Sequence, residues 1–154
     1  MSLAVIHSRA LDALDAPEVT VEVHLASGLP SFTLVGLADT EVKEARERVR
    51  AALAHSGLGF PNNKRITVNL APADLPKSCS GFDLAIAVAI LVASGQVRAG
   101  RVSGVEFLGE LAFSGALRRV PGLIPALLRA RQAGRLTIVP AAGTLEVLGV
   151  NVAR

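Results

Sequence analysis

The chain has 154 residues, 51% of them hydrophobic and 19% charged, which is typical of one globular domain with a sizeable core and excludes a disordered protein. A single cysteine excludes an intrachain disulfide, and 3% aromatic residues, with no Trp or Tyr, argue against an aromatic ligand box or a base-stacking platform. The net charge of +3 permits contact with nucleic acid without requiring it, because acidic residues are interleaved with the basic ones.

The N-terminal residues do not have the pattern of a signal peptide, because Asp12 and Asp15 interrupt a short apolar run. We therefore expect a cytoplasmic protein without membrane contact. Alternation of apolar and polar residues over the first half of the chain is typical of half-buried strands. It predicts strands at residues 4–6, 19–25, 32–35 and 65–70.

Residues 40–56 predict an amphipathic surface helix, with Asp39 or Thr40 as its N-cap. An apolar stripe faces the core, and charged residues, Arg48 among them, fill a solvated face. Charges three or four positions apart on a helix are neighbours, so ion pairs are expected on this face. They are Glu44 with Arg48 and Glu47 with Arg50.

Residues 75–97 are the stretch around which the chain is organised. A turn of small polar residues leads into residues 82–93, in which Asp83 is the only charge. A helix without a polar face is stable only when other elements cover it all round, so the sequence predicts a central core helix. The turn before it carries a cation and three hydroxyl or thiol groups, Lys77, Ser78, Cys79 and Ser80.

The remainder of the chain predicts a hairpin that adds two strands to the sheet, a last helix and two more extended segments. They cover residues 105–113 and 115–120, residues 123–134, and residues 136–139 and 147–152. Strands in runs mixed with three helices predict an α/β fold, a two-layer sandwich of a mixed sheet and helices.

Motifs for chemistry are few. No GxxxxGK[ST] motif is present, so this chain is not expected to hold ATP in a P-loop. The histidines are scattered, without metal-ligand spacing, at positions 7, 24 and 55. The turn before the core helix is the one candidate for nucleophilic catalysis, with Ser80 or Cys79 activated by Lys77, although small polar residues are also ordinary helix caps.

Four segments carry a resemblance to a known family: MSLAVIHSRAL, GLADTEVKEARERVRAAL, RITVNLAPADLPKSCSGFDLAIAVAIL and GELAFSGALRRVPG. Together they resemble the N-terminal domain of the bacterial magnesium-chelatase-like AAA+ ATPases, the ComM and YifB family. That domain is similar to the proteolytic domain of Lon, so the resemblance implies a single Lon-protease-like domain over residues 1–154. It also implies an ATPase module after residue 154, in which ATP and Mg²⁺ would bind, and a hexameric ring.

The resemblance to Lon also allows a test of catalysis. Laid over this chain, the place of the Lon nucleophile falls on Gly81, and the place of its partner lysine falls on Ile124. Neither residue can supply a nucleophile or a base, so the resemblance implies the fold without the peptidase activity.

The resemblance implies a non-catalytic domain that contributes to ring assembly and DNA handling in DNA uptake, recombination or branch migration. One alternative is a Lon-like serine peptidase that uses Ser80 or Cys79, and another is a regulatory subunit of a magnesium chelatase. Basic residues expected to lie close together form a candidate phosphate-binding patch: Lys64, Arg65, Lys77, Arg118 and Arg119. Charges on the helix at 40–56 are candidate contacts between ring subunits: Glu44, Arg46, Glu47 and Arg50.

Overall fold

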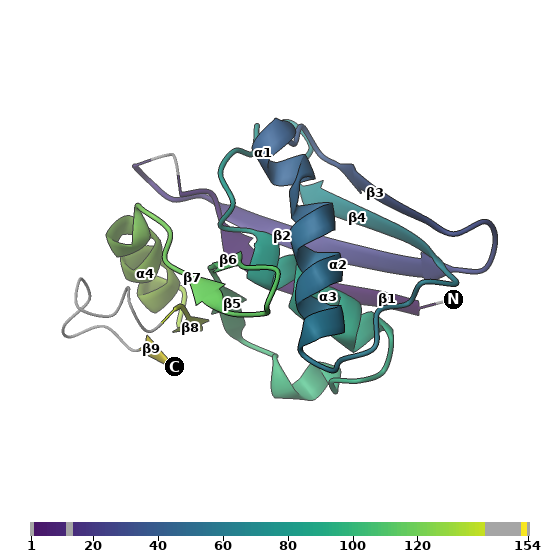
Figure 1. Cartoon of the computed structure of the whole chain (residues 1–154). Helices are drawn as coiled ribbons and strands as arrows, with labels where there is room; N and C mark the ends of the chain where they lie inside the picture. The colour runs from purple at the N-terminus through teal and green to yellow at the C-terminus, as the bar shows by residue number, and fades with distance from the viewer. Residues whose placement is uncertain (1, 12–13, 141–151, 154) are drawn as a thin grey trace.

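The strands that alternation predicts pair into one seven-stranded mixed sheet in the computed structural model, which describes residues 2–11, 14–140 and 152–153 (Figure 1). Across the sheet the strand order is β3-β4-β2-β1-β5-β8-β9. These strands are β1 (Ser2–Arg9), β2 (Glu18–Ala26), β3 (Ser31–Val35), β4 (Arg65–Ala71), β5 (Val105–Phe107), β8 (Leu136–Ile138) and β9 (Val152–Ala153).

The sheet is antiparallel only where β2 meets its two neighbours, β1 and β4. The pairs β3 with β4, β1 with β5, β5 with β8 and β8 with β9 are parallel. Parallel neighbours require crossover connections. The helices are α1 (Thr40–Lys43), α2 (Ala45–His55), α3 (Asp83–Ala93), the 3₁₀ helix η1 (Ala99–Arg101) and α4 (Leu123–Gln132). Helix α2 lies in the connection between β3 and β4, and α4 lies in the one between β5 and β8.

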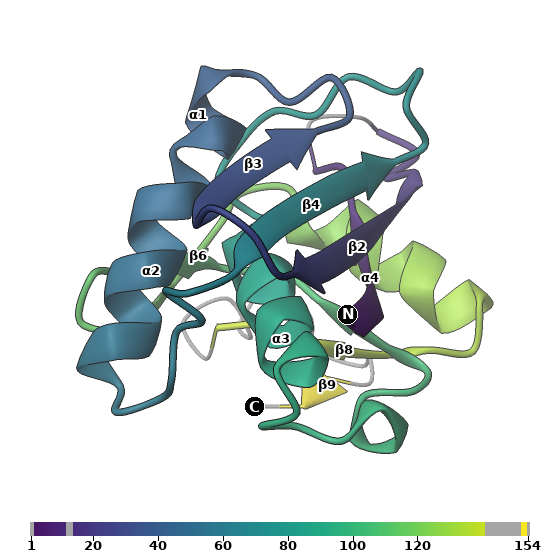
Figure 2. The same ribbon diagram turned by 90° about the vertical axis from the view of Figure 1, so that its right-hand side faces the viewer.

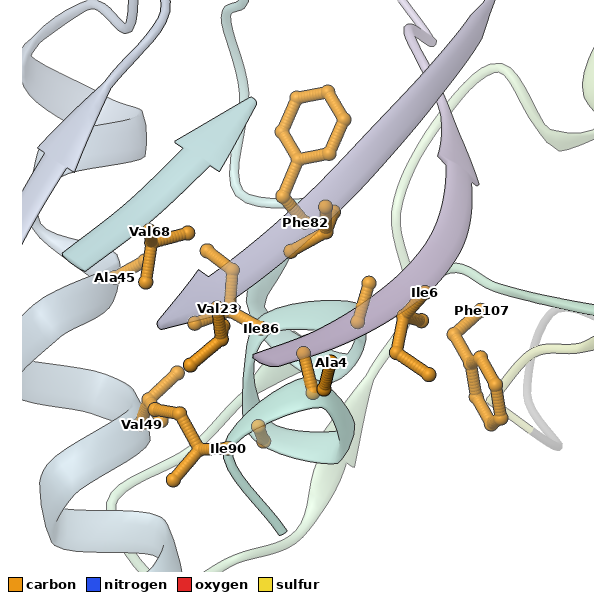
Figure 3. Close-up of a cluster of buried hydrophobic side chains, with 14 of the residues drawn as sticks. Ala4, Ile6, Val23, Ala45, Val49, Val68, Phe82, Ile86, Ile90 and Phe107 are labelled. Carbon is orange, nitrogen blue, oxygen red and sulfur yellow. The ribbon is translucent and has the colours of Figure 1, made fainter. Parts of the chain in front are cut away.

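The main core lies between the sheet and the helices α2 and α3. Every second residue of β2, from Val19 to Leu25, is buried, as its alternation predicts. Ile86 and Ile90 of α3 are fully buried against these strands, and burial of each such side chain contributes about 1.5–3 kcal/mol. Figure 3 shows the contributors from strands and helices converging on this layer: Ala4, Ile6, Val23, Ala45, Val49, Val68, Phe82, Ile86, Ile90 and Phe107.

The prediction of a central core helix is confirmed over α3, with one qualification. Three of its apolar side chains, Leu84, Val88 and Val92, are only partly buried. Leu84 and Val88 line a shallow apolar hollow of about 180 Å³ between α2, α3 and the hairpin that follows. The helix is therefore covered on most of its circumference rather than all round.

The opposite face of β1 and β3 carries exposed apolar side chains in the described part of the chain. Leu3 and Val5 of β1 are 63% and 47% exposed, and Val35 of β3 is 45% exposed. Between them on this face lie polar residues of β2 and β4, including Asn69, which donates to the Glu22 carboxylate over 2.8 Å. The two-layer arrangement thus leaves this part of the sheet with one face open.

Two predicted elements differ from the structure. The helix expected over residues 40–56 is divided at Glu44, with α1 capped by the Asp39 carboxylate, which accepts from the Val42 amide at 2.9 Å. The predicted hairpin adds only β5 to the main sheet. Its later part, β6 (Glu110–Leu111) with β7 (Leu117–Arg118), forms a separate two-stranded sheet, because the chain turns after β5 to bond the start of α3 through Gly109.

A second, smaller cluster of buried side chains lies under α4, which packs near β8 and apart from α2 and α3 (Figure 1). Its members come from four segments: Leu11, Ala16, Leu108, Val120, Leu123, Ala126, Leu127 and Val139. The extended segment predicted at residues 147–152 lies outside the described residues except for Val152, which begins β9. None of the described helices is long and apolar enough to cross a membrane.

Candidate functional site

The turn before α3 holds its lysine inside the protein. Lys77 is 1% exposed, and its ammonium donates to the carbonyl of Pro72. Its backbone amide donates to Leu37 at 2.9 Å, and its carbonyl accepts from the Asp39 amide at 3.0 Å. Burial lowers the pKa of Lys77, and the Asp74 carboxylate opposes that shift. Lys77 therefore fastens the turn to the segment that follows β3 and is not available to a phosphate in solvent.

The two segments that hold the positions expected for a Lon-like dyad, Gly81 and Ile124, both approach Leu11. A Cβ placed on Gly81 would lie 2.8 Å from Leu11 Cδ1, and one placed on Gly122, at the start of α4, would lie 2.6 Å from the Leu11 carbonyl oxygen. A serine at position 81 would thus require the Leu11 side chain to move. Ile124 is 47% exposed and carries no titratable group. The structure brings the two segments together without the side chains of a dyad.

The alternative nucleophiles have other neighbours. Cys79 adopts a left-handed conformation, φ 70°, and its thiol accepts from the Gly81 amide with an N···S distance of 3.4 Å. Ser80 is 8% exposed, and its carbonyl accepts from the Asp83 amide at 3.2 Å. The ammonium of Lys77 is directed to Pro72. These contacts shape the turn before α3, whose N-cap residue, Phe82, makes no side-chain capping hydrogen bond.

Asp83 forms a buried ion pair that the sequence did not reveal. Its carboxylate accepts from Arg48 Nε at 2.6 Å and Nη2 at 3.0 Å, and from the Leu111 amide at 3.0 Å. Arg48 was expected on a solvated face, but its side chain is only 15% exposed. Burial works to lower the pKa of Arg48, and the bonds to Asp83 more than offset it, so the pKa is raised. The pair joins α2, α3 and β6.

A second buried network joins the two halves of the sheet. Arg9, at the end of β1, donates to both oxygens of Glu106, at 2.6 and 2.9 Å. Arg135 donates to Glu106 at 3.3 Å and to Glu18 at 2.8 Å, and the latter hydrogen bond lowers the pKa of Glu18. Arg9 and Glu106 are separated by 97 residues in the chain, and no local pattern in the sequence reveals their pairing.

The structure does not bring the five predicted phosphate-binding residues into one patch. Lys64 and Arg65 lie where β4 begins, whereas Lys77 follows its far end and is buried. Seven residues of strand separate the two places, roughly 20 Å at about 3.3 Å per residue. Arg118 lies on the β6–β7 hairpin, 3.8 Å from the Glu110 carboxylate, and Arg119 follows it. The set therefore contains two pairs of chain neighbours, Lys64 with Arg65 and Arg118 with Arg119, and the buried Lys77.

The charged face of α2 has the predicted pairs. Glu44 lies 3.6 Å from Arg48 and Glu47 lies 3.9 Å from Arg50, so both predictions are confirmed. Arg46 donates to the carbonyl of Lys43 at 3.1 Å and to that of Phe32 at 3.4 Å. Phe32 belongs to β3, the edge strand of the sheet, so Arg46 covers part of an edge that could otherwise pair with another chain.

The last of these charges, Arg50, borders a pocket of about 250 Å³. Its guanidinium lies over the rings of Phe32 and Phe60, with 5.9 and 5.5 Å to the ring centroids. The two rings are 5.7 Å apart. Lys64 adds a second cation to the lining, which contains no carboxylate: Pro30, Ser31, Phe32, Arg50, Phe60, Pro61, Asn62, Lys64 and Ile66.

Within the described ranges, no group of three or more His, Cys, Asp or Glu side chains is arranged to hold a metal ion. The pocket beside Arg50 contains one predicted phosphate-binding residue, Lys64, and one predicted contact residue between ring subunits, Arg50. The sequence offered no signal for the pocket itself, because Phe32 and Phe60 are brought together by tertiary packing.

Comparison with known proteins places these features in context. The family model described as subunit ChlI of Mg-chelatase matches residues 21–143. The YifB protein of Escherichia coli K12 is 50% identical over 151 residues, covering 98% of this chain and 30% of the relative. YifB of Salmonella typhimurium is 53% identical over 147 residues, with 96% and 29% covered. Competence protein ComM of Haemophilus influenzae is 54% identical over 139 residues, with 90% and 27% covered. The chain thus spans about three tenths of the length of these relatives.

Proposed function

The chain belongs to the Mg-chelatase subunit ChlI family, and from this premise we propose that it is the non-catalytic N-terminal domain of a magnesium-chelatase-like AAA+ ATPase. In this proposal the domain contributes to assembly of a hexameric ring and to the handling of DNA during uptake, recombination or branch migration. ATP and Mg²⁺ would bind in an ATPase module that follows the domain, since this chain has no P-loop. The name of one relative, a competence protein, supports a role in DNA uptake.

The observation that carries the non-catalytic role is the pair of segments around Leu11. Both segments approach Leu11, and the positions that the resemblance assigns to a dyad hold Gly81 and Ile124. An aliphatic side chain and a glycine can neither attack a carbonyl nor accept a proton. The lysine of the turn, Lys77, is buried, and its ammonium donates to a backbone carbonyl.

Catalysis offers the first test. Incubation of the chain with casein should give no turnover above that of a protein-free sample. Hydrolysis that disappears in Ser80→Ala or Cys79→Ala would establish the peptidase and overturn the non-catalytic role.

Deletion of residues 1–154 from the longer protein offers the second test. The deletion variant should retain basal ATP hydrolysis but lose ring assembly or DNA uptake. Unchanged assembly and unchanged uptake would together refute the assembly and DNA roles.

The other alternative, a regulatory subunit of a magnesium chelatase, is favoured by the description of the family that matches. The two proposals differ in substrate. If insertion of Mg²⁺ into a porphyrin requires the full-length protein, the chelatase role is supported. If cells that lack the protein lose transformation but insert Mg²⁺ into porphyrin normally, the DNA role is supported.

A further inference from the structure

One end of the domain carries cations and almost no carboxylates. The loop at residues 57–64 and the turn after α3 are joined by two hydrogen bonds, from the Gly59 amide to Gln96 Oε1 at 3.0 Å and from Gln96 Nε2 to the Gly59 carbonyl at 2.7 Å. β3 and β4 begin at this end, on the side that faces the viewer in Figure 2. We call it the basic end and define it by its cations: Arg50, Lys64, Arg65, Arg98 and Arg101.

Apart from α2, which supplies Arg50, the segments that build the basic end contain no acidic residue: residues 25–38, 57–73 and 84–105. In the described part of the chain, the carboxylate paired with these cations is Glu47, which lies 3.9 Å from Arg50 and whose side chain is 70% exposed. An exposed pair at this distance is worth little and is screened by salt. The basic end therefore holds five of the 16 Lys and Arg residues of the chain with one weakly paired carboxylate, whereas the chain as a whole is nearly balanced at +3.

The pocket described above lies at this end and is prepared for an anion. The Arg50 guanidinium makes cation–π contacts with Phe32 and Phe60, and these contacts do not use its N–H groups as hydrogen-bond donors. Lys64 supplies a compact second charge across the same pocket. Its volume of about 250 Å³ is below the roughly 300–1,000 Å³ of a site for a complete drug-sized ligand. It suits one unit of a longer molecule.

Two more hollows lie at the basic end, one sharing Lys64 with the pocket and one lined by two further cations. Lys64 also lines a second hollow, together with Ser2 and Ser94. Gln96, two residues beyond Ser94, lines a third hollow with Arg98 and Arg101. A ligand with repeated negative charges could therefore contact cations in succession, starting from the aromatic pocket. A compact anion such as free phosphate would use only one of these places.

We propose that the basic end binds single-stranded nucleic acid, with one nucleotide in the Arg50–Lys64 pocket. The phosphate lies against Arg50 and Lys64, and the base packs against Phe60, which is partly exposed. The low aromatic content argues against a platform for several bases, and the pocket offers a ring for one. Bases of a duplex are stacked on one another and do not reach such a surface, whereas those of a single strand can stack on an aromatic ring. An acidic peptide would satisfy the cations but leave the rings unused. The inference deepens the proposed DNA role and rests on it.

Fluorescence anisotropy of the 154-residue chain with labelled oligo(dT) tests the proposal. Lys64→Gln should reduce the slope of log K against log salt by about 0.7, the value for one phosphate contact on a single strand. Phe60→Leu keeps an apolar side chain against Phe32 and should lower affinity at least about fivefold with an unchanged slope, because stacking is lost but no charge. Arg131→Gln on α4 removes an exposed charge outside the basic end, and should change neither quantity.

Three results would overturn the proposal: no binding of oligo(dT) by the parent chain, equal binding by the parent and Lys64→Gln, or binding of polyglutamate as tight as that of oligo(dT). Thermal melting of each variant checks its fold, and Lys64→Gln, at a partly exposed position, provides a test even if Phe60→Leu unfolds. Failure here, combined with DNA binding by the full-length protein, would remove the basic end as the site and leave the DNA role standing. Casein hydrolysis would instead refute the non-catalytic role and leave the oligo(dT) result unaffected.

Discussion

Replacement of Arg48 by methionine should show how strongly the buried ion pair holds α2 to α3. The substitution keeps an unbranched side chain but leaves the Asp83 carboxylate, which has no exposure, with the Leu111 amide as its remaining recorded donor. Removal of one member of a buried pair typically costs about 3–5 kcal/mol. At about 2–4 °C per kcal/mol for a domain of this size, Tm should fall by roughly 6–20 °C.

The same variant should have a distinctive pH dependence. Burial raises the pKa of the Asp83 carboxyl above its ordinary value of 3.8, and loss of the Arg48 charge removes the main influence that lowers it. A carboxyl with a raised pKa in the folded state binds its proton more tightly than it does in the unfolded chain, so lower pH favours the folded state. The penalty of Arg48→Met should therefore be largest near neutral pH and should shrink as the pH falls toward 3.8.

Urea unfolding across this pH range measures both effects. Glu44→Gln is the matched control, because Glu44 also contacts Arg48, at 3.6 Å, but its side chain is 62% exposed, so the change should cost less than about 0.5 kcal/mol. The double variant Arg48→Met, Asp83→Leu should cost less than the sum of the single changes by more than about 2 kcal/mol. A loss below about 1 kcal/mol for Arg48→Met, with the parent's pH profile, would refute this account of the pair.

Three other substitutions probe the core, the backbone and the buried lysine by urea unfolding. Ile90→Ala, at a fully buried position, should cost about 2–5 kcal/mol, whereas Leu128→Ala, 45% exposed, should stay within about 0.5 kcal/mol; equal effects would contradict the assigned core. Gly36→Ala should cost at least about 2 kcal/mol, because φ is 113° and a Cβ would lie 2.2 Å from the Leu70 carbonyl oxygen; a neutral result would show that this turn is wrongly described. Burial lowers the pKa of Lys77, so the unfolded chain binds the ammonium proton more tightly than the folded chain does. The free energy of unfolding of the parent should therefore rise as the pH approaches 10.5, and Lys77→Met should abolish this rise. An unchanged rise in Lys77→Met would show that another group causes it.

Local pattern determined much of this protein. The alternation in residues 19–25 and 65–70 required strands with one buried face, and the apolar run after the turn required a covered helix, because the side-chain period depends only on neighbours in the chain. The same holds for the ion pairs on α2, Glu44 with Arg48 and Glu47 with Arg50, whose partners are one helical turn apart. The resemblance that identified the family also came from continuous segments of sequence.

Tertiary structure decided what these elements do for particular side chains. The sequence predicts Lys77 as a surface cation, yet the pairing of its segment with Ala38, beyond the end of β3, encloses it. The sequence predicts Arg48 on a solvated face, yet the position of α3 places the buried carboxylate of Asp83, 35 residues away in the chain, beside it. The pocket depends on Phe32 and Phe60 meeting across a strand and a loop. Such contacts follow from which strands pair and how helices pack, a choice made by many weak interactions between distant segments, and no window of neighbouring residues contains that information.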